Sequence, residues 1–342
     1  VFNSLRKLDV LQELLEDDTI TEIMVNGPNH IFYEKNGQMQ EHPYHFASEE
    51  KLQDVVQQIV GKHNRVVNLT SPIVDTRLED GSRVNIVLMP IAIDGSAISI
   101  RKFRREPIDM QALIHLGTLN EEVAEFLKQI VVARYNVFIS GGTSSGKTTF
   151  LNALSAFIPT NERIITIEDS AELQLQQTPN LVRLETRNSN QEGVKAITPR
   201  ELIHTALRMR PDRIIVGECR GEETLDMLQA MNTGHDGSLS TGHGNSIGDM
   251  LSRIEMMVLM GNDLPLLAIR QQIAMGIDIM IHLERGKDQK RRVVEVSELL
   301  GICEGEFQLN PLYLYREGRF EKVGALHQTR KWELSKEATD EK

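Results

Sequence analysis

Two patterns of hydrophobic and polar positions divide this chain. In the first third, apolar and polar residues alternate over short runs such as TEIMVNG (21–27), as expected of half-buried strands, and residues 49–64 repeat apolar positions at helical spacing. Asn-Gly and Asp-Gly pairs between the runs favour tight turns. Residues 1–105 are therefore predicted to form a small α+β domain on an antiparallel sheet. The pairs are Asn26-Gly27, Asn36-Gly37, Asp80-Gly81 and Asp94-Gly95.

From residue 121 onward, apolar strand patterns alternate with helical patterns. That order is typical of an α/β domain with a parallel sheet and crossover helices, predicted here over residues 121–330. Asn120, followed by two glutamates, is expected to cap the first helix. Residues 106–120 have no clear period and are predicted as a linker, and residues 331–342 as a polar tail. The runs are NVFIS, TTFLNALSAFI, RIITIE, ELIHTALRM and RIIVGE.

The methionines Met250, Met256, Met257 and Met260 are expected to pack in the core.

Composition limits the classes of function. The 342 residues include 38 Lys plus Arg and 49 Asp plus Glu. The resulting net charge of -11 argues against a protein whose main function is to bind nucleic acid. The two cysteines form no disulfide framework, and the longest apolar runs are too short to span a bilayer. We therefore expect a cytoplasmic protein. The chain begins at Val1 rather than Met, which leaves open a preceding segment.

A glycine-rich stretch, GGTSSGKTTF (141–150), lies between a strand pattern and a helix pattern and matches G-x-x-x-x-G-K-[ST]. In that motif, backbone N–H groups close around phosphates at a helix N-terminus. Lys147 is expected to reach the β- and γ-phosphates and Thr148 to bind Mg²⁺, so the stretch predicts a nucleoside triphosphate site. The alternative is a glycine-rich turn without a ligand. The predicted phosphate-binding residues are Gly141, Gly142, Thr143, Ser144, Ser145, Gly146, Lys147, Thr148 and Thr149.

A phosphate loop requires a carboxylate at the end of a neighbouring strand. RIIVGE ends at Glu218, which is expected to hold the Mg²⁺ shell through water and to polarise the attacking water. Many buried strands end in an acid, so this interpretation depends on the phosphate loop.

Three further acids, Glu168, Asp169 and Glu172, follow the strand pattern RIITI. Such a cluster is typical of a solvated helix start. Alternatively, one of the three orders the attacking water or the Mg²⁺ shell, and the strand order favours this second interpretation.

The stretch TGHDGSLSTGHGNS contains His235 and His243. Two histidines without a third ligand are poor grounds for zinc. A buried, hydrogen-bonded histidine and a γ-phosphate sensor both remain open, because small neighbours allow an imidazole to approach a nucleotide.

Two arginines of the first domain, Arg83 and Arg101, lie within alternating strands, where either is a candidate arginine finger. Arg104 and Arg105 are expected to belong to a solvated charged face.

Together these motifs resemble the type II and type IV secretion ATPase superfamily. The stretches GGTSSGKTT, TIEDSAELQL, ALRMRPDRIIVGECRG and STGHGNS match, in order, the Walker A, Asp box, Walker B and His box of that family. IMVNGPNHIFYEKNGQMQ and DGSRVNIVLMPIAIDGSAISIRKF are also similar, so the resemblance runs from about Leu8 to Phe320. It is nearest to the tight-adherence (Flp) pilus assembly branch, followed by the type IV secretion traffic ATPases. The tetracysteine zinc motif of several type II secretion ATPases is absent from the sequence.

The resemblance implies a RecA-like P-loop ATPase domain preceded by a smaller α+β PAS-like domain. It also implies a homohexamer that holds ATP and Mg²⁺ between the two domains and drives an inner-membrane platform protein to extend or retract a pilus. The protein would then lie at the inner face of the cytoplasmic membrane and bind no nucleic acid. By the same resemblance, Glu218 is the Walker B acid, Glu168, Asp169 and Glu172 belong to the Asp box, His243 is the His-box histidine, and Arg83 and Arg101 reach the nucleotide.

Two rival functions remain. A nucleic-acid motor would need a basic channel lined by aromatic residues, whereas this acidic chain is only 5% aromatic. A nucleotide-gated scaffold without hydrolysis is disfavoured because Lys147, Thr148 and Glu218 are all present.

Overall fold

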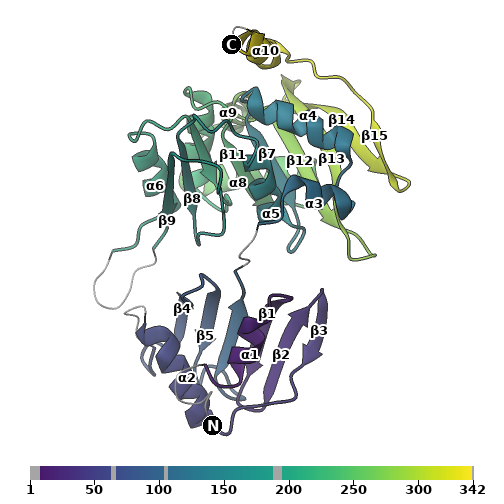
Figure 1. Cartoon of the computed structure of the whole chain (residues 1–342). Helices are drawn as coiled ribbons and strands as arrows, with labels where there is room; N and C mark the ends of the chain where they lie inside the picture. The colour runs from purple at the N-terminus through teal and green to yellow at the C-terminus, as the bar shows by residue number, and fades with distance from the viewer. Residues whose placement is uncertain (1–7, 63–66, 104–106, 188–194, 341–342) are drawn as a thin grey trace. The chain divides into compact units, whose positions relative to one another are not determined.

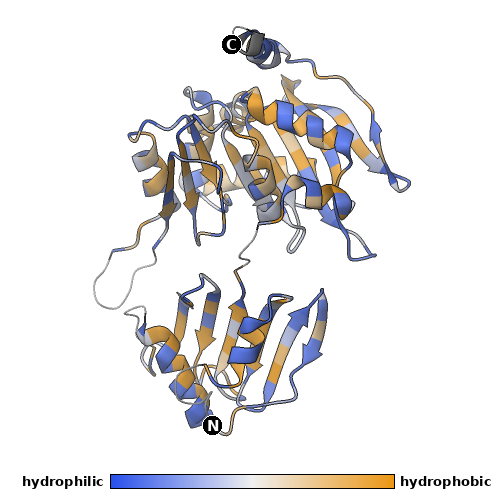
Figure 2. Cartoon of the chain, in the orientation of Figure 1, coloured by the Kyte–Doolittle hydropathy of each residue, from blue (hydrophilic) through white to orange (hydrophobic). Residues whose placement is uncertain are grey.

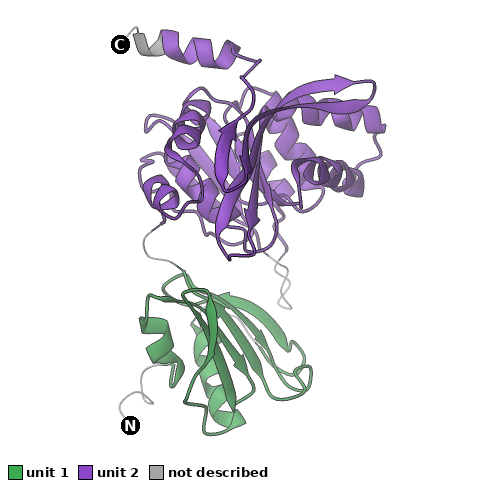
Figure 3. Ribbon diagram, turned by 90° about the vertical axis from the view of Figure 1, so that its right-hand side faces the viewer, with its two compact units in different colours: residues 1–106 green, residues 107–342 purple. Residues whose placement is uncertain are grey.

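The computed structural model of the chain describes residues 8–62, 67–103, 107–187 and 195–340 (Figure 1). The chain divides into two compact units, residues 1–106 and 107–342 (Figure 3). Arg104 and Arg105, expected on a solvated face, lie outside the described residues.

Unit 1 is built on a six-stranded antiparallel sheet of order β3-β2-β1-β6-β5-β4. The predicted turns are present: Gly27, Gly37, Gly81 and Gly95 all have positive φ, which glycine adopts without strain. The apolar face of the helix predicted in residues 49–64 is buried in the core of the unit. The elements are α1 (Leu11–Glu16), β1 (Ile20–Asn26), β2 (His30–Lys35), β3 (Gln38–Glu41), α2 (Glu49–Gly61), β4 (Ile73–Arg77), β5 (Arg83–Val87) and β6 (Ala97–Arg101).

Unit 2 contains a nine-stranded sheet and most of the helices of the chain (Figure 1). Its first half comprises α3 (Met110–His115), α4 (Glu121–Val132), β7 (Val137–Gly141), α5 (Lys147–Ser155), β8 (Ile164–Glu168), β9 (Leu181–Glu185), α6 (Pro199–Ala206), β10 (Arg213–Val216) and α7 (Glu223–Asn232). Its second half comprises β11 (Leu239–His243), α8 (Ile247–Gly261), α9 (Leu266–Gly276), β12 (Ile279–Arg285), β13 (Arg291–Cys303), β14 (Glu306–Arg316), β15 (Arg319–Lys322) and α10 (Arg330–Asp340).

The strand order of this sheet is β15-β14-β13-β12-β7-β11-β10-β8-β9, and the strands from β12 to β9 are parallel. Every residue of β7, β8 and β10 is buried, which explains their continuous apolar runs (Figure 2). Residues of α3, α4 and α5 share one core with the sheet, and residues of α6 to α9 share a second. Helices therefore cover both faces, as an α/β domain requires. Among the described residues, no helix has both the length and the apolar character needed to cross a bilayer.

The structure differs from the sequence prediction at three places. The segment predicted as a linker contains α3, because Met110 and Leu113 pack into the core of unit 2. The segment predicted as a polar tail is largely helical, and its Trp332 stacks on Phe126 of α4 with 5.9 Å between ring centroids. The methionine prediction holds for Met250 and Met257 but is wrong for Met256 and Met260, which are 59% and 69% exposed because α8 turns them away from the sheet.

Candidate functional site

The candidate site lies at the carboxyl ends of four adjacent parallel strands. The order β7-β11-β10-β8 places the phosphate loop after β7 beside His243, the last residue of β11, which pairs with Gly141. Glu218 follows the next strand, β10, and Glu168 ends β8. Open α/β sheets bind ligands at this edge, so the sheet topology brings together residues that are far apart in sequence.

The predicted phosphate loop connects β7 to α5 as a strand, a tight loop and a helix. A Cβ on Gly141 would lie 2.5 Å from Ser145 Oγ and 2.6 Å from Leu283 O, so only glycine fits there. Gly146 precedes the helix with a φ of 93°, and Ser144 has a φ of 60°. This conformation gathers backbone N–H groups at the N-terminus of α5, which is the geometry of an anion-binding loop.

Lys147 is the first residue of α5, and only 8% of it is exposed. Its Nζ donates to Gly141 O at 2.9 Å and to Gly142 O at 3.0 Å, and it lies 3.2 Å from Nδ1 of His243. The ammonium is thus held at the mouth of the loop, next to the hydroxyl-bearing Thr148. Gly142, Thr143 and His243 line a cavity of about 510 Å³ at this mouth.

His243 connects the phosphate loop to Glu218. Its Nε2 lies 2.7 Å from Oε1 of Glu218. Burial lowers the pKa of His243, and the neighbouring Lys147 lowers it further, whereas Glu218 opposes the shift. The imidazole is therefore neutral near pH 7, and the contacts favour the tautomer with Nδ1 facing the ammonium and the proton on Nε2. The His243 side chain is 39% exposed, so it is not a fully buried core histidine, and its contact with a nucleotide stays a prediction.

Glu218 also contacts a cation that the sequence analysis missed. Arg220 donates from Nε to Oε2 of Glu218 at 2.7 Å, and its Nη1 lies 3.3 Å from Oδ2 of Asp169. A continuous line of charged and polar groups therefore crosses the carboxyl ends of the four strands. Its members are Lys147, His243, Glu218, Arg220 and Asp169.

The three predicted acids after β8 have different environments. Glu168 is buried, its Oε2 accepts the N–H groups of Glu172 at 2.7 Å and Leu173 at 2.9 Å, and burial raises its pKa. In the described residues, its Oε1 is buried without a hydrogen-bond partner. Asp169 contacts Arg220, whereas Glu172 contributes its backbone N–H. No helix starts here, so the interpretation as a solvated helix start is wrong.

The residues at this edge fit a Mg²⁺ ion. Thr148, Glu218 and the unpartnered Oε1 of Glu168 are hard oxygen donors, as Mg²⁺ prefers. Within the described ranges, no cluster of three His, Cys, Asp or Glu residues could hold a metal alone. Direct contact of Thr148 with Mg²⁺ and contact of Glu218 through water stay predictions. His235 lies outside the line and faces Ala230 O at 3.3 Å.

Arg291 and Arg253 were also missed by the sequence analysis. Arg291, at the start of β13, donates from Nε to Ser144 O at 2.9 Å, and its Cδ would lie 3.1 Å from a Cβ at Gly146. Arg291 therefore packs against the phosphate loop from the side of the C-terminal strands. Arg253 of α8 lines the cavity at the loop mouth. The basic run KRRV was the only sequence feature that pointed to Arg291, and no sequence feature distinguished Arg253.

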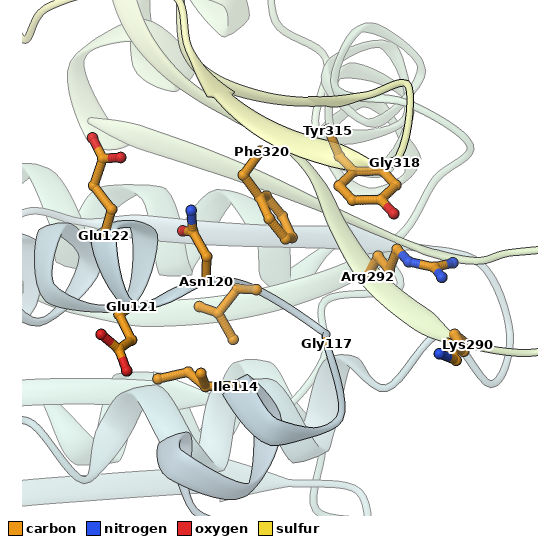
Figure 4. A pocket seen from close by; sticks show the side chains of 11 residues that line it. Ile114, Gly117, Asn120, Glu121, Glu122, Lys290, Arg292, Tyr315, Gly318 and Phe320 are labelled. Atoms are coloured by element: carbon orange, nitrogen blue, oxygen red, sulfur yellow. The ribbon is translucent and has the colours of Figure 1, made fainter.

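A second cavity, of about 590 Å³, lies between α4 and the C-terminal strands (Figure 4). Tyr315 and Phe320 form one wall with ring centroids 4.8 Å apart, and the guanidinium of Arg292 lies 5.2 Å from the Tyr315 ring. Asn120 and Glu121 lie on the opposite side. Aromatic walls with charged groups at the rim are suited to a flat polar ring such as a nucleobase. No residue of the phosphate loop lines this cavity, although Arg291, next to Arg292 in β13, donates to Ser144 O of that loop.

The two predicted arginine fingers are neighbours in unit 1. Arg83 on β5 is the direct cross-strand partner of Arg101 on β6. Arg83 also pairs with Arg77 on β4, a residue that the sequence analysis did not single out. Directly paired residues share one face of a sheet, so the three arginines form a row on that face. Their approach to the nucleotide stays a prediction.

Comparisons with known proteins agree with these motifs. The sequence model of the family described as "Type II/IV secretion system protein" matches residues 4–302. A Mycobacterium tuberculosis protein, provisionally named for conjugal transfer, is 34% identical over 324 residues, covering 93% of this chain and 91% of that protein. The type IV secretion system protein VirB11 of Bartonella quintana is 30% identical over 332 residues, covering 85% and 92%.

Among solved structures, the pilus retraction motor PilT with bound ADP aligns with a TM-score of 0.63 and 20% identity, covering 98% of this chain and 87% of that one. Such a likeness concerns the fold. The predicted RecA-like P-loop domain preceded by a smaller α+β PAS-like domain is thereby confirmed.

Proposed function

The chain belongs to the type II/IV secretion system protein family, and from this premise we propose that it is a motor that hydrolyses ATP. In this proposal a homohexamer powers assembly or retraction of a type IV pilus of the Flp/Tad kind, or related secretion, through an inner-membrane platform protein. The observation that carries the proposal is the continuous line from Lys147 to Asp169 beside the phosphate loop. A passive nucleotide-binding loop has no need of such a line.

Each residue of this line has a separate role in the proposed hydrolysis. The N–H groups of the loop and the Lys147 ammonium hold the β- and γ-phosphates. Glu218 accepts a hydrogen bond from the attacking water and orients it, while Glu168 has a buried oxygen available for a second water. The neutral His243, held between Lys147 and Glu218, contacts the γ-phosphate and connects its presence to the carboxylate. Bound Mg²⁺ supplies charge neutralisation at the phosphates, with Thr148 as its protein ligand.

The nucleobase is expected in the cavity of Figure 4, stacked on Tyr315. The Tyr315→Ala variant should therefore bind ATP less tightly, whereas affinity for tripolyphosphate, which has no base, should be unchanged. Equal loss for both ligands would contradict this placement.

Arg83 and Arg101 are proposed to complete the site from the N-terminal unit. A site that needs residues from two units reaches its full activity only when those units approach, so each turnover is accompanied by motion. That motion is the proposed output of the motor.

The main alternative is a traffic ATPase of type IV secretion or conjugation. It is supported by the names of the relatives that are 34% and 30% identical, which refer to conjugal transfer and to type IV secretion. Both alternatives share the hydrolysis step. Deleting the gene separates them, because loss of surface filaments supports the pilus motor and loss of protein or DNA transfer with filaments intact supports the traffic ATPase.

The first experiment is ATP turnover by the purified chain, sized by light scattering, with and without single-stranded and duplex DNA. We expect hexamers whose turnover ignores DNA and falls about 100-fold or more in the Glu218→Gln variant. Strong stimulation by DNA would favour a nucleic-acid motor. Tight ATP binding without turnover would favour a nucleotide-gated scaffold.

A further inference from the structure

Arg220 is held in place by the turn that follows Glu218. Its backbone N–H donates to Oε1 of Glu223 at 2.6 Å, and the N–H of Gly221 donates to the same oxygen at 2.9 Å. Glu223 is only 7% exposed, so these two hydrogen bonds are largely shielded from water. Cys219 N donates to Thr241 O at 2.8 Å, which holds the start of the turn against β11. The turn is thus built to direct the Arg220 side chain back over the acid two residues before it.

The guanidinium of Arg220 occupies one oxygen of Glu218. Nη2 and Nε lie 2.5 Å and 2.7 Å from Oε2, while Oε1 faces His243. A third nitrogen, Nη1, lies 3.3 Å from Asp169. One cation therefore holds two carboxylates from neighbouring strands close together, where they would otherwise repel each other.

The same guanidinium is able to leave. The Arg220 side chain is 59% exposed and lines the cavity at the phosphate-loop mouth together with Gly142 and Thr143. A long, exposed arginine exchanges partners at small energetic cost, because its charge stays solvated throughout.

We propose that Arg220 is a positioning residue that acts as an exchangeable counter-ion, holding Glu218 and Asp169 together until a divalent cation takes over their negative charge. This inference rests on the proposed nucleotide site. A guanidinium and the water shell of a divalent cation seek the same carboxylate oxygens, so loading the cation releases Arg220 from Oε2. Arg220 thereby weakens binding of the divalent cation to the nucleotide-free protein. The cation then binds tightly only when the phosphates of a nucleotide are also bound.

The test measures Mn²⁺ binding to the nucleotide-free 342-residue chain by electron paramagnetic resonance, comparing Arg220→Gln with a matched control. Arg200→Gln is that control, because Arg200 also bridges two carboxylates, Glu222 at 3.3 Å and Asp226 at 3.1 Å, outside the site. Both variants remove one positive charge and leave two acids. We expect Arg220→Gln to bind Mn²⁺ about tenfold more tightly than the wild type, and Arg200→Gln to resemble the wild type.

Two further variants identify the carboxylate that gains affinity for Mn²⁺ and the role of the arginine charge. Adding Glu218→Gln to Arg220→Gln should abolish the gained affinity, whereas Arg220→Lys, which keeps the charge, should show little gain. Unchanged Mn²⁺ affinity in Arg220→Gln, at a melting temperature near that of the wild type, would overturn the proposal. So would an equal gain in Arg200→Gln, which would indicate a general effect of charge.

Hydrolysis provides a separate readout. In Arg220→Gln, the Mg²⁺ concentration for half-maximal turnover should fall, and kcat should fall more than the KM for ATP rises. An unaltered Mg²⁺ dependence would contradict the exchange. Because the Mn²⁺ measurement needs no turnover, failure of this inference is distinguishable from failure of the proposed ATPase function.

Discussion

A buried ion pair beneath the site offers a sharp test of how the strand that carries Glu218 is held. Arg213, the first residue of β10, is fully buried and binds Glu162 through two bonds, from Nε at 2.6 Å and from Nη2 at 2.8 Å. Its Nη1 also donates to Val131 O at 2.7 Å. In the Arg213→Met variant, the nearly buried Glu162 carboxylate keeps Arg134, at 3.4 Å, as its one cationic partner in the described part of the chain.

The expected loss follows from this geometry. Removing one partner of a buried pair leaves a desolvated charge and destabilises a protein by about 3–5 kcal/mol. For a unit of this size, that corresponds to a fall in melting temperature of roughly 6–20 °C. The double variant Arg213→Met with Glu162→Met should recover most of the loss, because no charge is then buried without a partner.

Differential scanning calorimetry of the full chain is the assay, with attention to the transition of unit 2. Lys195→Met is the control, because it removes an ion pair to Glu201 whose partners are 83% and 45% exposed and should change stability by less than about 0.5 kcal/mol. If Arg213→Met melted like that control, or if the double variant were as unstable as the single one, the reasoning would be refuted.

Three further predictions concern the site. Gly146→Ala should lower ATP affinity about tenfold by fluorescent-nucleotide titration, because its φ is 93° and the new Cβ would lie 3.1 Å from Arg291; unchanged affinity would contradict the loop geometry. Arg83→Gln should lower kcat about 100-fold or more and binding little; weakened binding with intact turnover per bound nucleotide would reject the finger. Burial raises the pKa of Glu168, so its ionisation opposes folding as pH rises through that pKa. Glu168→Gln should therefore lose hydrolysis yet gain melting temperature at pH 7.5 and not at pH 4, and a gain independent of pH would argue against this cause.

Local features were predictable because neighbours in sequence decide them. Asn120 caps α4 by accepting from Val123 N at 2.9 Å, as the pair of following glutamates indicated. The phosphate loop was equally clear, since its motif lies within eight consecutive residues and Gly146 has a φ of 93°, which favours glycine. The helix α3, in contrast, has six residues, too few to show a period. The strand β9 lies at the edge of the sheet and is only partly buried, so its apolar pattern is weak.

Exposure was harder to predict than secondary structure. Met256 and Met257 are adjacent in α8 and were both expected in the core, yet one is 59% exposed and the other is buried. A helix with apolar residues on more than one face does not reveal which of them meets the sheet. Packing of α8 against α7, α9 and β12 decides which of them is buried.

The sequence by itself indicated the phosphate-loop motif, Glu218 after a neighbouring strand, Arg83 and Arg101 as candidates, and the family. Only the tertiary structure decided that Arg220 bridges Glu218 and Asp169, that Arg291 holds Ser144 from 147 residues away, and that Arg77 joins Arg83. The physical reason is that a motif depends on the conformation of a few consecutive residues. A contact between side chains of different strands depends instead on strand order and register, which the folded core selects and local patterns do not encode.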